Sequence, residues 1–161
     1  MIVGLISDTH GLLRPEALAA LEGSEHLIHA GDIGDAKVLE ALARIAPLTA
    51  IRGNNDTQPW ASKLAEVETI ELAGVRIHVL HDLGALVPRP EARGIRVVVS
   101  GHSHVPRIEE RDGVLYVNPG SAGPRRFTLP VSVGCLVIRS GTVTAGLQEL
   151  AVARARTRGH T

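Results

Sequence analysis

The hydrophobic positions in the first third of the chain form short runs that alternate between two patterns. Ile2–Ser7, His26–Ala30 and Pro47–Ile51 are almost entirely apolar, as is typical of strands that are buried on both faces. Between them, Pro15–Leu21 predicts a short helix with proline in its first turn. Asp35–Ile45 has the spacing of an amphipathic helix. This order of strands and helices predicts a parallel sheet with right-handed crossovers.

The later part of the chain is dominated by pairs of strand-like runs joined by two-residue turns. The turns are Ala73-Gly74, Asp112-Gly113 and Ser140-Gly141, each of which is a hairpin signal. One late helix is expected at Pro90–Gly94. The strands expected here are Val67–Leu72, Val75–Leu80, Arg96–Ser100, Arg107–Arg111, Val114–Asn118, Val133–Arg139 and Thr142–Glu149. We therefore expect an α/β fold of two packed sheets, the first partly parallel, with helices on the outside.

Length and composition limit the class of protein. The 161 residues suffice for a single domain, which we expect over residues 1–150, with the Arg-rich residues 151–161 as a flexible tail. Positive and negative charges balance at 17 each, so no basic excess indicates a nucleic-acid or membrane partner. The single cysteine, Cys135, excludes an intramolecular disulfide. We find neither a signal-peptide pattern nor an apolar stretch of about 18 residues, and so expect a cytoplasmic protein.

Residues that can bind metal ions follow the predicted strands at the point where each strand ends. Asp8 and His10 follow the first strand, and Asp32 follows the second. Ligands of open α/β sheets bind at the carboxyl ends of the strands, so we expect these side chains to meet in one cleft. The same placement recurs after three further strands, which gives seven candidate ligands: Asp8, His10, Asp32, Asn54, His81, His102 and His104.

The chemical types in this set indicate divalent first-row metals, which accept carboxylate, imidazole and amide ligands together. Two metals about 3.5–4 Å apart need a bridging ligand, and a carboxylate can span both. Asp32, central in chain order, is the candidate bridge. Other polar residues fit structural roles better: His29 and His78 lie inside strands, where hydrogen-bonded core histidines are common, and Asp56 is expected to hold its own loop.

The ordered series Asp8-x-His10, Gly31-Asp32, Gly53-Asn54-x-Asp56, His81 and Gly101-His102-x-His104 resembles the calcineurin-like metallophosphoesterase superfamily. Its short branch without a cap domain, the YfcE-type phosphodiesterases, is the most similar. The resemblance implies a two-layer β-sandwich of mixed sheets flanked by helices. It also implies a first metal held by Asp8, His10, Asp32 and His104. The second metal would be held by Asp32, Asn54, His81 and His102.

Two positions depart from the family pattern. Many phosphatases of the superfamily have a histidine after the asparagine ligand, where it protonates the leaving group, but this chain has Asn55. An amide cannot supply an acidic proton, so substrates with good leaving groups are favoured. Asp82 stands where members commonly have glycine. Asn55, together with Asn118 and Ser121 of a motif shared with the short branch, is a candidate substrate-binding residue, although turn chemistry explains the Pro119-Gly120 segment equally well.

The resulting hypothesis is a metal-dependent phosphodiesterase that hydrolyses small phosphodiesters by in-line attack of a metal-bridging hydroxide. Asp32, Asn54 and His81 would be its catalytic residues. Two divalent ions are expected, with manganese as the predicted metal and iron, nickel, cobalt or zinc as alternatives. A non-catalytic scaffold on the same fold and a nuclease are the competing functions. Few aromatic residues are available to stack bases, which makes nucleic acid an unlikely partner, and a homo-oligomer is possible.

Overall fold

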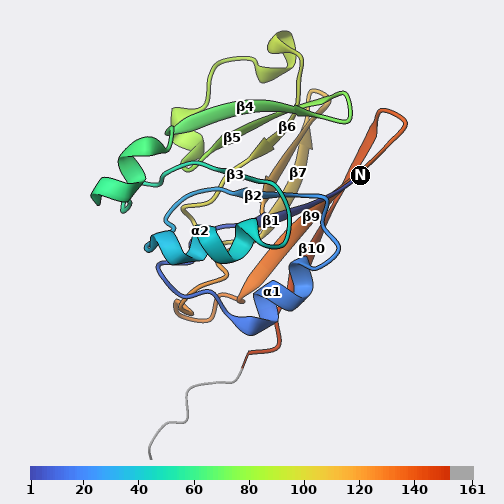
Figure 1. The fold of residues 1–161 in the computed structure, drawn as a ribbon. Coiled ribbons are helices and arrows are strands. Elements are labelled where there is room, and N and C mark those ends of the chain that lie inside the picture. Colours follow the sequence, from blue (N-terminus) through green and yellow to red (C-terminus); the bar gives the residue numbers. More distant parts are fainter. Residues whose placement is uncertain (153–161) are drawn as a thin grey trace, which may run out of the picture.

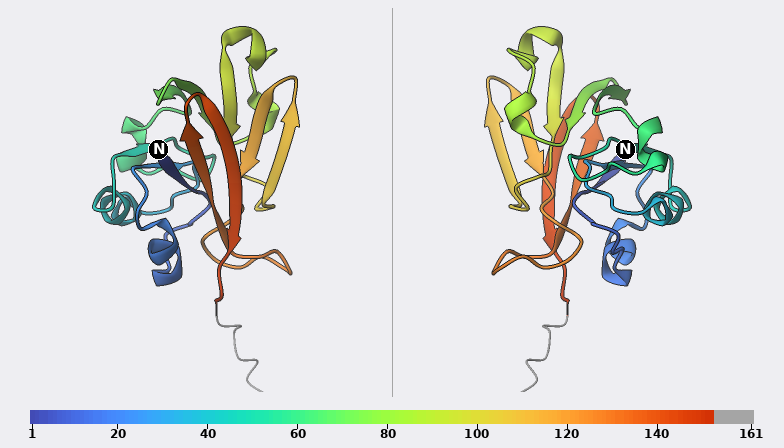
Figure 2. Two further views of the ribbon diagram at one scale, coloured as in Figure 1. Left: turned by 90° about the vertical axis from the view of Figure 1, so that its right-hand side faces the viewer. Right: turned by 90° about the vertical axis from the view of Figure 1, so that its left-hand side faces the viewer.

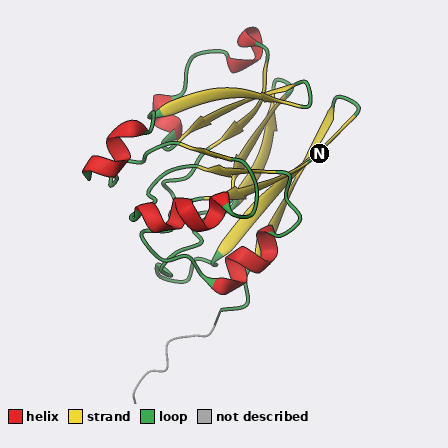
Figure 3. Cartoon of the chain, viewed as in Figure 1, coloured by secondary structure: helices red, strands yellow, loops and turns green. Residues whose placement is uncertain are grey.

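The computed structural model describes residues 1–152, and residues 153–161, most of the expected tail, lie outside the described part. Two mixed five-stranded sheets pack face to face, with a few helices at the periphery (Figures 1 and 3). This arrangement confirms the predicted α/β fold of two packed sheets. No helix within the described residues is long and apolar enough to cross a membrane.

The first sheet has the strand order β10-β9-β1-β2-β3. Its centre is parallel, since β1 pairs with β2 and β2 with β3 in the same direction. The hairpin of β9 and β10 is added antiparallel to β1. The bounds of these strands are β1 Ile2–Ile6, β2 His26–His29, β3 Leu48–Ala50, β9 Ser132–Arg139 and β10 Thr142–Glu149.

The second sheet has the order β4-β5-β6-β8-β7, in which β5, β6 and β8 are parallel. The two predicted hairpins form its edges, β4 with β5 and β7 with β8. Its strands are β4 Val67–Leu72, β5 Val75–Leu80, β6 Ile95–Val99, β7 Arg107–Arg111 and β8 Val114–Asn118. Both sheets therefore have a parallel centre whose strands end in the same region of the molecule.

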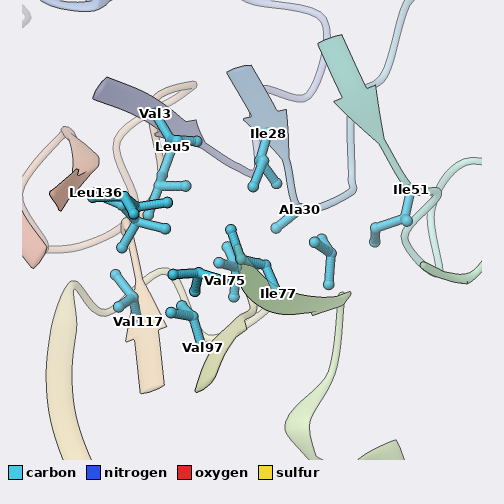
Figure 4. Close-up of a cluster of buried hydrophobic side chains, with 13 residues drawn as sticks. Val3, Leu5, Ile28, Ala30, Ile51, Val75, Ile77, Val97, Val117 and Leu136 are labelled. Atoms are coloured by element: carbon cyan, nitrogen blue, oxygen red, sulfur yellow. The ribbon is translucent and has the colours of Figure 1, made fainter. Parts of the chain in front are cut away.

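The core between the sheets consists of aliphatic side chains that alternate along each strand. Val3 and Leu5 of β1 face Val75, Ile77 and their neighbours across the interface (Figure 4). Because the inner faces carry Val, Leu, Ile and Ala, the chain fills this layer almost without aromatic residues. A second cluster, which includes Leu21 of α1 (Pro15–Leu21) and Leu42 of α2 (Ala36–Ala43), covers the other face of the first sheet.

Two α-helices cover the outer face of the first sheet, on the side away from β7 and β8 (Figure 2). These are α1, Pro15–Leu21, and α2, Ala36–Ala43. Helix α2 begins one residue after the start of the predicted Asp35–Ile45, because Asp35 is its N-cap and accepts a hydrogen bond from Lys37 N at 2.9 Å. It ends two residues early, at Ala43, with Arg44 as its C-cap. The expected helix near Pro90 is a short 3₁₀ helix. This predicted helix is η3, Pro90–Arg93. Two further 3₁₀ helices were not predicted: η1, Pro59–Lys63, and η2, Leu83–Ala85.

Candidate metal centre

The segments that follow the parallel strands of both sheets meet at one edge of the sandwich. Asp8 N donates to Gly31 O at 3.0 Å, which joins the ends of β1 and β2. Gly101 N donates to His81 O at 3.0 Å, which joins the ends of β6 and β5. His102 N then donates to Asp8 Oδ2 at 3.1 Å and links the two sheets. The predicted convergence of ligand-bearing strand ends is therefore present.

Several of the expected ligands have a left-handed backbone, with φ between 46° and 71°. Asp, Asn and His adopt this region more readily than most residues, but each instance still costs roughly 1–3 kcal/mol. Such strain persists only where the surrounding structure holds it in place, and it concentrates at functional sites. The residues concerned are Asp8, His10, Asp32, His102 and His104.

Asp8 uses its two carboxylate oxygens differently. Its Oδ2 accepts hydrogen bonds from Ser7 Oγ at 2.7 Å and from His102 N. Its Oδ1 is fully buried and has no hydrogen-bond partner within the described residues. That oxygen instead lies 3.3 Å from His104 Nε2 and 3.8 Å from His81 Nε2. A buried, unpartnered carboxylate oxygen facing imidazole nitrogens is what a metal ligand requires.

Asp32 is held by the residue that stands in place of the family's histidine. Asn55 donates from its backbone N to Oδ1 and from its side-chain Nδ2 to Oδ2, both at 3.0 Å. Asp32 Oδ2 also lies 3.2 Å from His81 Nε2. Burial alone would raise the pKa of Asp32, but His81 and the Asn55 hydrogen bond outweigh it and lower that pKa. Asp32 is thus kept ionised, as a metal ligand must be.

The orientation of His81 is set by one hydrogen bond. Its Nδ1 lies 2.7 Å from Ala30 O, and because a carbonyl only accepts, Nδ1 must carry the proton. In the neutral ring, Nε2 is then a free lone pair directed at Asp8 and Asp32. Metal-binding histidines are commonly fixed in this way by a carbonyl behind the ring. The tautomer suits a cation at Nε2.

Two groups of side chains have ligand atoms that all lie within 4.8 Å of one another. The first is Asp8, His10 and His104, in which the two Nε2 atoms are 3.4 Å apart. The second is Asp8, Asp32 and His81. Asp8 belongs to both groups, and Asp32 Oδ2 lies 3.9 Å from His10 Nε2 as well. The donor set fits cations, and both carboxylates lie between the two groups.

His102 and Asn54 belong to neither of these groups, and both are exposed. They lie beside them, since both line a cavity of about 220 Å³ together with His81. His102 Nε2 is 4.0 Å from Oδ2 of Asp82, which also lines this cavity. The structure therefore gathers five predicted ligands tightly and leaves Asn54 and His102 at the open side.

Charge in this cluster is unbalanced in a way that a cation would relieve. Burial raises the pKa of Asp8, and nearby Asp32 raises it further, against the lowering effects of Ser7, His81 and His104. Burial likewise lowers the pKa of His104, which favours its neutral form. Burial lowers the pKa of His81 as well, but its hydrogen bonds with Asp32 and Ala30 outweigh burial and raise that pKa. Metal ions bind ionised carboxylates and neutral imidazoles, so a cation would displace protons from Asp8 and His81.

Comparison with known proteins decides the family. The model for the calcineurin-like phosphoesterase superfamily domain matches residues 1–141. The chain belongs to this superfamily. The family and the fold agree with the resemblance drawn from the sequence motifs.

Individual relatives of this calcineurin-like phosphoesterase are archaeal and bacterial. A probable metallophosphoesterase of Methanothermobacter thermautotrophicus is 32% identical over 144 residues, covering 81% of this chain and 82% of the relative. Phosphodiesterase YfcE of Escherichia coli is 30% identical and covers 81% of this chain and 84% of its own. The structure of an archaeal phosphodiesterase superposes with a TM-score of 0.77 at 25% identity, covering 92% of this chain and 100% of that one.

Two of the candidate substrate-binding residues of the phosphoesterase are engaged in its own framework. Asn118 is buried, and its Nδ2 donates to Gly101 O at 2.9 Å. Ser121 is also buried, and its Oγ donates to Asp8 O at 2.9 Å. These bonds position the loops that carry Asp8 and His102. Contact of either residue with substrate stays a prediction.

Two residues expected to be structural do form internal hydrogen bonds. Asp56 is buried and accepts hydrogen bonds from Ile33 N, Gly34 N and Gly53 N. His29 is fully buried; its Nδ1 accepts from Gly31 N, and its Nε2 lies 3.0 Å from Thr9 Oγ1. Both residues stabilise the loops that carry the ligands.

Sequence reasoning missed the residues that hold the carboxylates of the phosphoesterase. The sequence predicts Ser7 only as the end of a strand, yet its hydroxyl donates a hydrogen bond to Asp8. It predicts Asn55 as a substrate-binding residue that cannot act as a general acid, whereas the side-chain amide donates to Asp32. The available signal was position, since each hydrogen-bonding residue directly precedes or follows a ligand in the sequence.

Proposed function

We propose that the protein is a metal-dependent phosphodiesterase that hydrolyses small phosphodiesters at a centre of two divalent cations. The observation that carries the proposal is the unpartnered Oδ1 of Asp8, which faces imidazole nitrogens of both ligand groups. A divalent cation on either side of this oxygen would supply the missing partners. When bound, such cations neutralise phosphoryl charge and make a water molecule nucleophilic at neutral pH.

In this proposal Asp8, His10, Asp32 and His104 would hold one cation. Asp32, Asn54, His81 and His102 would hold the other. Asp32 remains the candidate bridge, and the position of Asp8 in both groups supports a similar role for it. Asn55 and Ser7 keep the carboxylates oriented, and Ala30 keeps Nε2 of His81 free. Manganese is the proposed metal, although the same nitrogen and oxygen ligands accept iron, cobalt, nickel or zinc.

The surroundings of the site favour a diester over a monoester. The cavity beside His81 is lined in part by Val67, Leu80 and Ala85, which can accommodate an apolar ester group. Glu66 and Asp82 add carboxylates to the same lining, and Arg52 of this lining forms an ion pair with Glu66 at 3.3 Å. A diester carries one negative charge, whereas a monoester carries up to two, so repulsion by the remaining carboxylate, Asp82, is weaker for the diester.

Protonation of the leaving group is not provided by residue 55. Both amide hydrogen-bonding groups of Asn55, the backbone N and Nδ2, are directed to Asp32. We therefore expect substrates whose leaving group departs without a proton to react fastest. Aryl diesters meet this condition, because a phenolate is a stable anion.

The experiment compares bis-p-nitrophenyl phosphate with p-nitrophenyl phosphate after chelation and reloading with each candidate metal. We expect turnover only after reloading, with kcat/KM at least about tenfold higher for the diester. Asp32→Asn should lower diester turnover by about 100-fold or more, since loss of a metal ligand exceeds the loss caused by its supporting residues. Asp112→Asn, the same change at an exposed hairpin turn, is the control and should have no effect.

Three results would change the conclusion. Full diester turnover by Asp32→Asn would exclude the role given to that carboxylate. Bound metal without turnover of either ester would instead support the non-catalytic scaffold, and cleavage of single-stranded DNA would support the nuclease. The cytoplasmic location and the oligomeric state stay predictions, which cell fractionation and size-exclusion chromatography would test.

A further inference from the structure

A cavity of about 480 Å³ lies on the face of the second sheet that is turned away from the first sheet. Side chains alternate along β5, so that Ile77 enters the core between the sheets while Arg76 and His78 point to the other side. Val87 and Arg93 of the segment between β5 and β6, part of which lies at the top of Figure 1, also line this cavity. The lining residues include Thr69, Arg76, His78, Val87, Arg93 and Ile95.

Two arginines bring positive charge to this cavity. Arg76 Nη1 donates to Arg93 O at 2.7 Å, which fixes one guanidinium against the segment that carries the other. Neither guanidinium forms an ion pair with a carboxylate within residues 1–152, where the paired arginines are Arg52, Arg107 and Arg111. Glu71 is the one acidic residue of the described lining. The balance of lining charges is therefore positive.

The third feature is a buried histidine with a free nitrogen. The side chain of His78 lines the cavity, although the residue is only 5% exposed. Its Nδ1 lies 2.8 Å from Thr69 Oγ1, whereas its Nε2 has no hydrogen-bond partner within the described residues. A buried polar atom without a partner is costly, and such atoms often mark a place where a ligand or ordered water completes the network.

We propose that this cavity is a second binding site, separate from the metal centre, for a small organic anion with a phosphate or carboxylate group. The guanidinium groups of Arg76 and Arg93 bind the oxyanion, since arginine presents paired N–H donors that match such groups. His78 Nε2 donates to it when the Thr69 hydroxyl donates to Nδ1. Val87 and Ile95 contact the apolar part of the ligand. The single carboxylate of Glu71 disfavours ligands with several negative groups.

The volume supports an organic ligand rather than a lone inorganic ion. Pockets for small molecules commonly enclose about 300–1,000 Å³, and this cavity lies in that range. Burial, followed by the charge of Arg93, lowers the pKa of His78, so its imidazole is neutral at pH 7 and donates without adding a third positive charge. The site is thus built for one anionic group and a modest apolar part.

The test uses isothermal titration of the full chain with inorganic phosphate, glycerol 3-phosphate and acetate, both in chelator and after metal loading. Binding that persists in chelator is expected, because the site uses no metal. Arg76→Gln should weaken it by at least about tenfold. Arg44→Gln removes the same charge from an exposed position after α2 and should leave it unchanged. Stronger binding of the phosphates than of acetate would identify a phosphate ligand, and the reverse a carboxylate ligand.

A second measurement keeps the test independent of whether a variant folds. In the wild-type chain, the imidazole ¹⁵N resonance of His78 Nε2 should shift on saturation with the tighter probe. Thermal unfolding of Arg76→Gln and Arg93→Gln would verify that both variants remain folded. The proposal is overturned if none of the three probes binds the chelated wild-type protein, or if both arginine variants bind as tightly as Arg44→Gln.

Discussion

The hydrogen bonds to Asp32 show how a single residue change can alter the chemistry of this site. Where many superfamily members have an acidic histidine, the chain has an amide whose N–H groups bind the Asp32 carboxylate. The side chain is thereby committed to orienting a ligand. Asn55 thus orients a metal ligand at the position where the family's histidine donates a proton to the leaving group.

Asn55→Ala tests this role directly. Removal of Nδ2 leaves Asp32 Oδ2 with one fewer donor, so the carboxylate should rotate more freely and bind metal less tightly. We expect metal affinity and diester turnover to fall by about 10- to 100-fold, the usual cost of losing such a supporting bond. Metal titration calorimetry and the diester assay measure the two effects. Gln58→Ala removes a comparable exposed amide from the same loop and should change neither value.

At the level of single residues, the sequence predicted the convergence of the candidate metal ligands better than it predicted the residues that support them. Asp8 and His104 could be found because Asp-x-His and His-x-His motifs follow apolar runs. The hydrogen bond from Ser121 to the Asp8 carbonyl joins residues 113 positions apart, and no local pattern encodes such a contact. Supports of this kind depend on how distant loops pack, which only the folded chain reveals.

At the level of elements, Asp56 connects the loops that follow β2 and β3. Its carboxylate accepts hydrogen bonds from Ile33 N and Gly34 N on one loop and from Gly53 N on the other. These parallel strands are short, and their side-by-side pairing alone does not fix the loops beyond them. Asp56 therefore holds the two loops together, as additional hydrogen bonds between longer strands would.

Asp56→Ala should be among the most destabilising single changes outside the apolar core. Three backbone N–H groups would lose a charged acceptor, and we expect the free energy of unfolding to fall by about 3 kcal/mol or more. Asp35→Ala, which removes only the N-cap of α2, should cost about 1 kcal/mol. Urea unfolding of both variants in chelator gives the comparison. Equal losses in the two variants would contradict the role assigned to Asp56.

The accuracy of the predicted elements followed the strength of their local signals. The hairpins β4–β5 and β7–β8 were predicted with their observed bounds, since a two-residue turn with glycine interrupts each pair. Strand β3 was predicted as Pro47–Ile51 but spans Leu48–Ala50, because its pairing with β2 ends early. Helices η1 and η2 were missed, as single 3₁₀ turns leave no hydrophobic period to recognise.

At the level of the whole molecule, His29 makes stability depend on pH. It lies in β2 beneath the metal centre and is fully buried. Burial, followed by repulsion from His81 when that ring is protonated, lowers the pKa of His29 from 6.5 to about 3. The unfolded chain therefore takes up a proton at this histidine near pH 6.5, whereas the folded chain does not. The contribution of neutral His29 to the free energy of unfolding is therefore fully present above pH 6.5 and decreases as the pH falls toward 3.

Between pH 7 and pH 5 this linkage should cost roughly 2 kcal/mol of unfolding free energy. Urea unfolding in chelator at the two pH values measures the total decrease. His29→Gln retains a donor and an acceptor but does not titrate, so its stability should decrease by correspondingly less over the same interval. An identical decrease in wild type and variant would show that other groups cause the acid sensitivity.

The left-handed conformation of so many ligand-bearing residues also bears on how this molecule can evolve. Glycine would adopt the backbone geometry of positions 8, 10, 32, 102 and 104 at no steric cost. If selection for hydrolysis were lost, glycine could therefore replace these ligands. The substitutions would relieve backbone strain and leave the two-sheet fold intact. Inactive descendants of such an enzyme should keep their shape and accumulate small residues along the former catalytic rim.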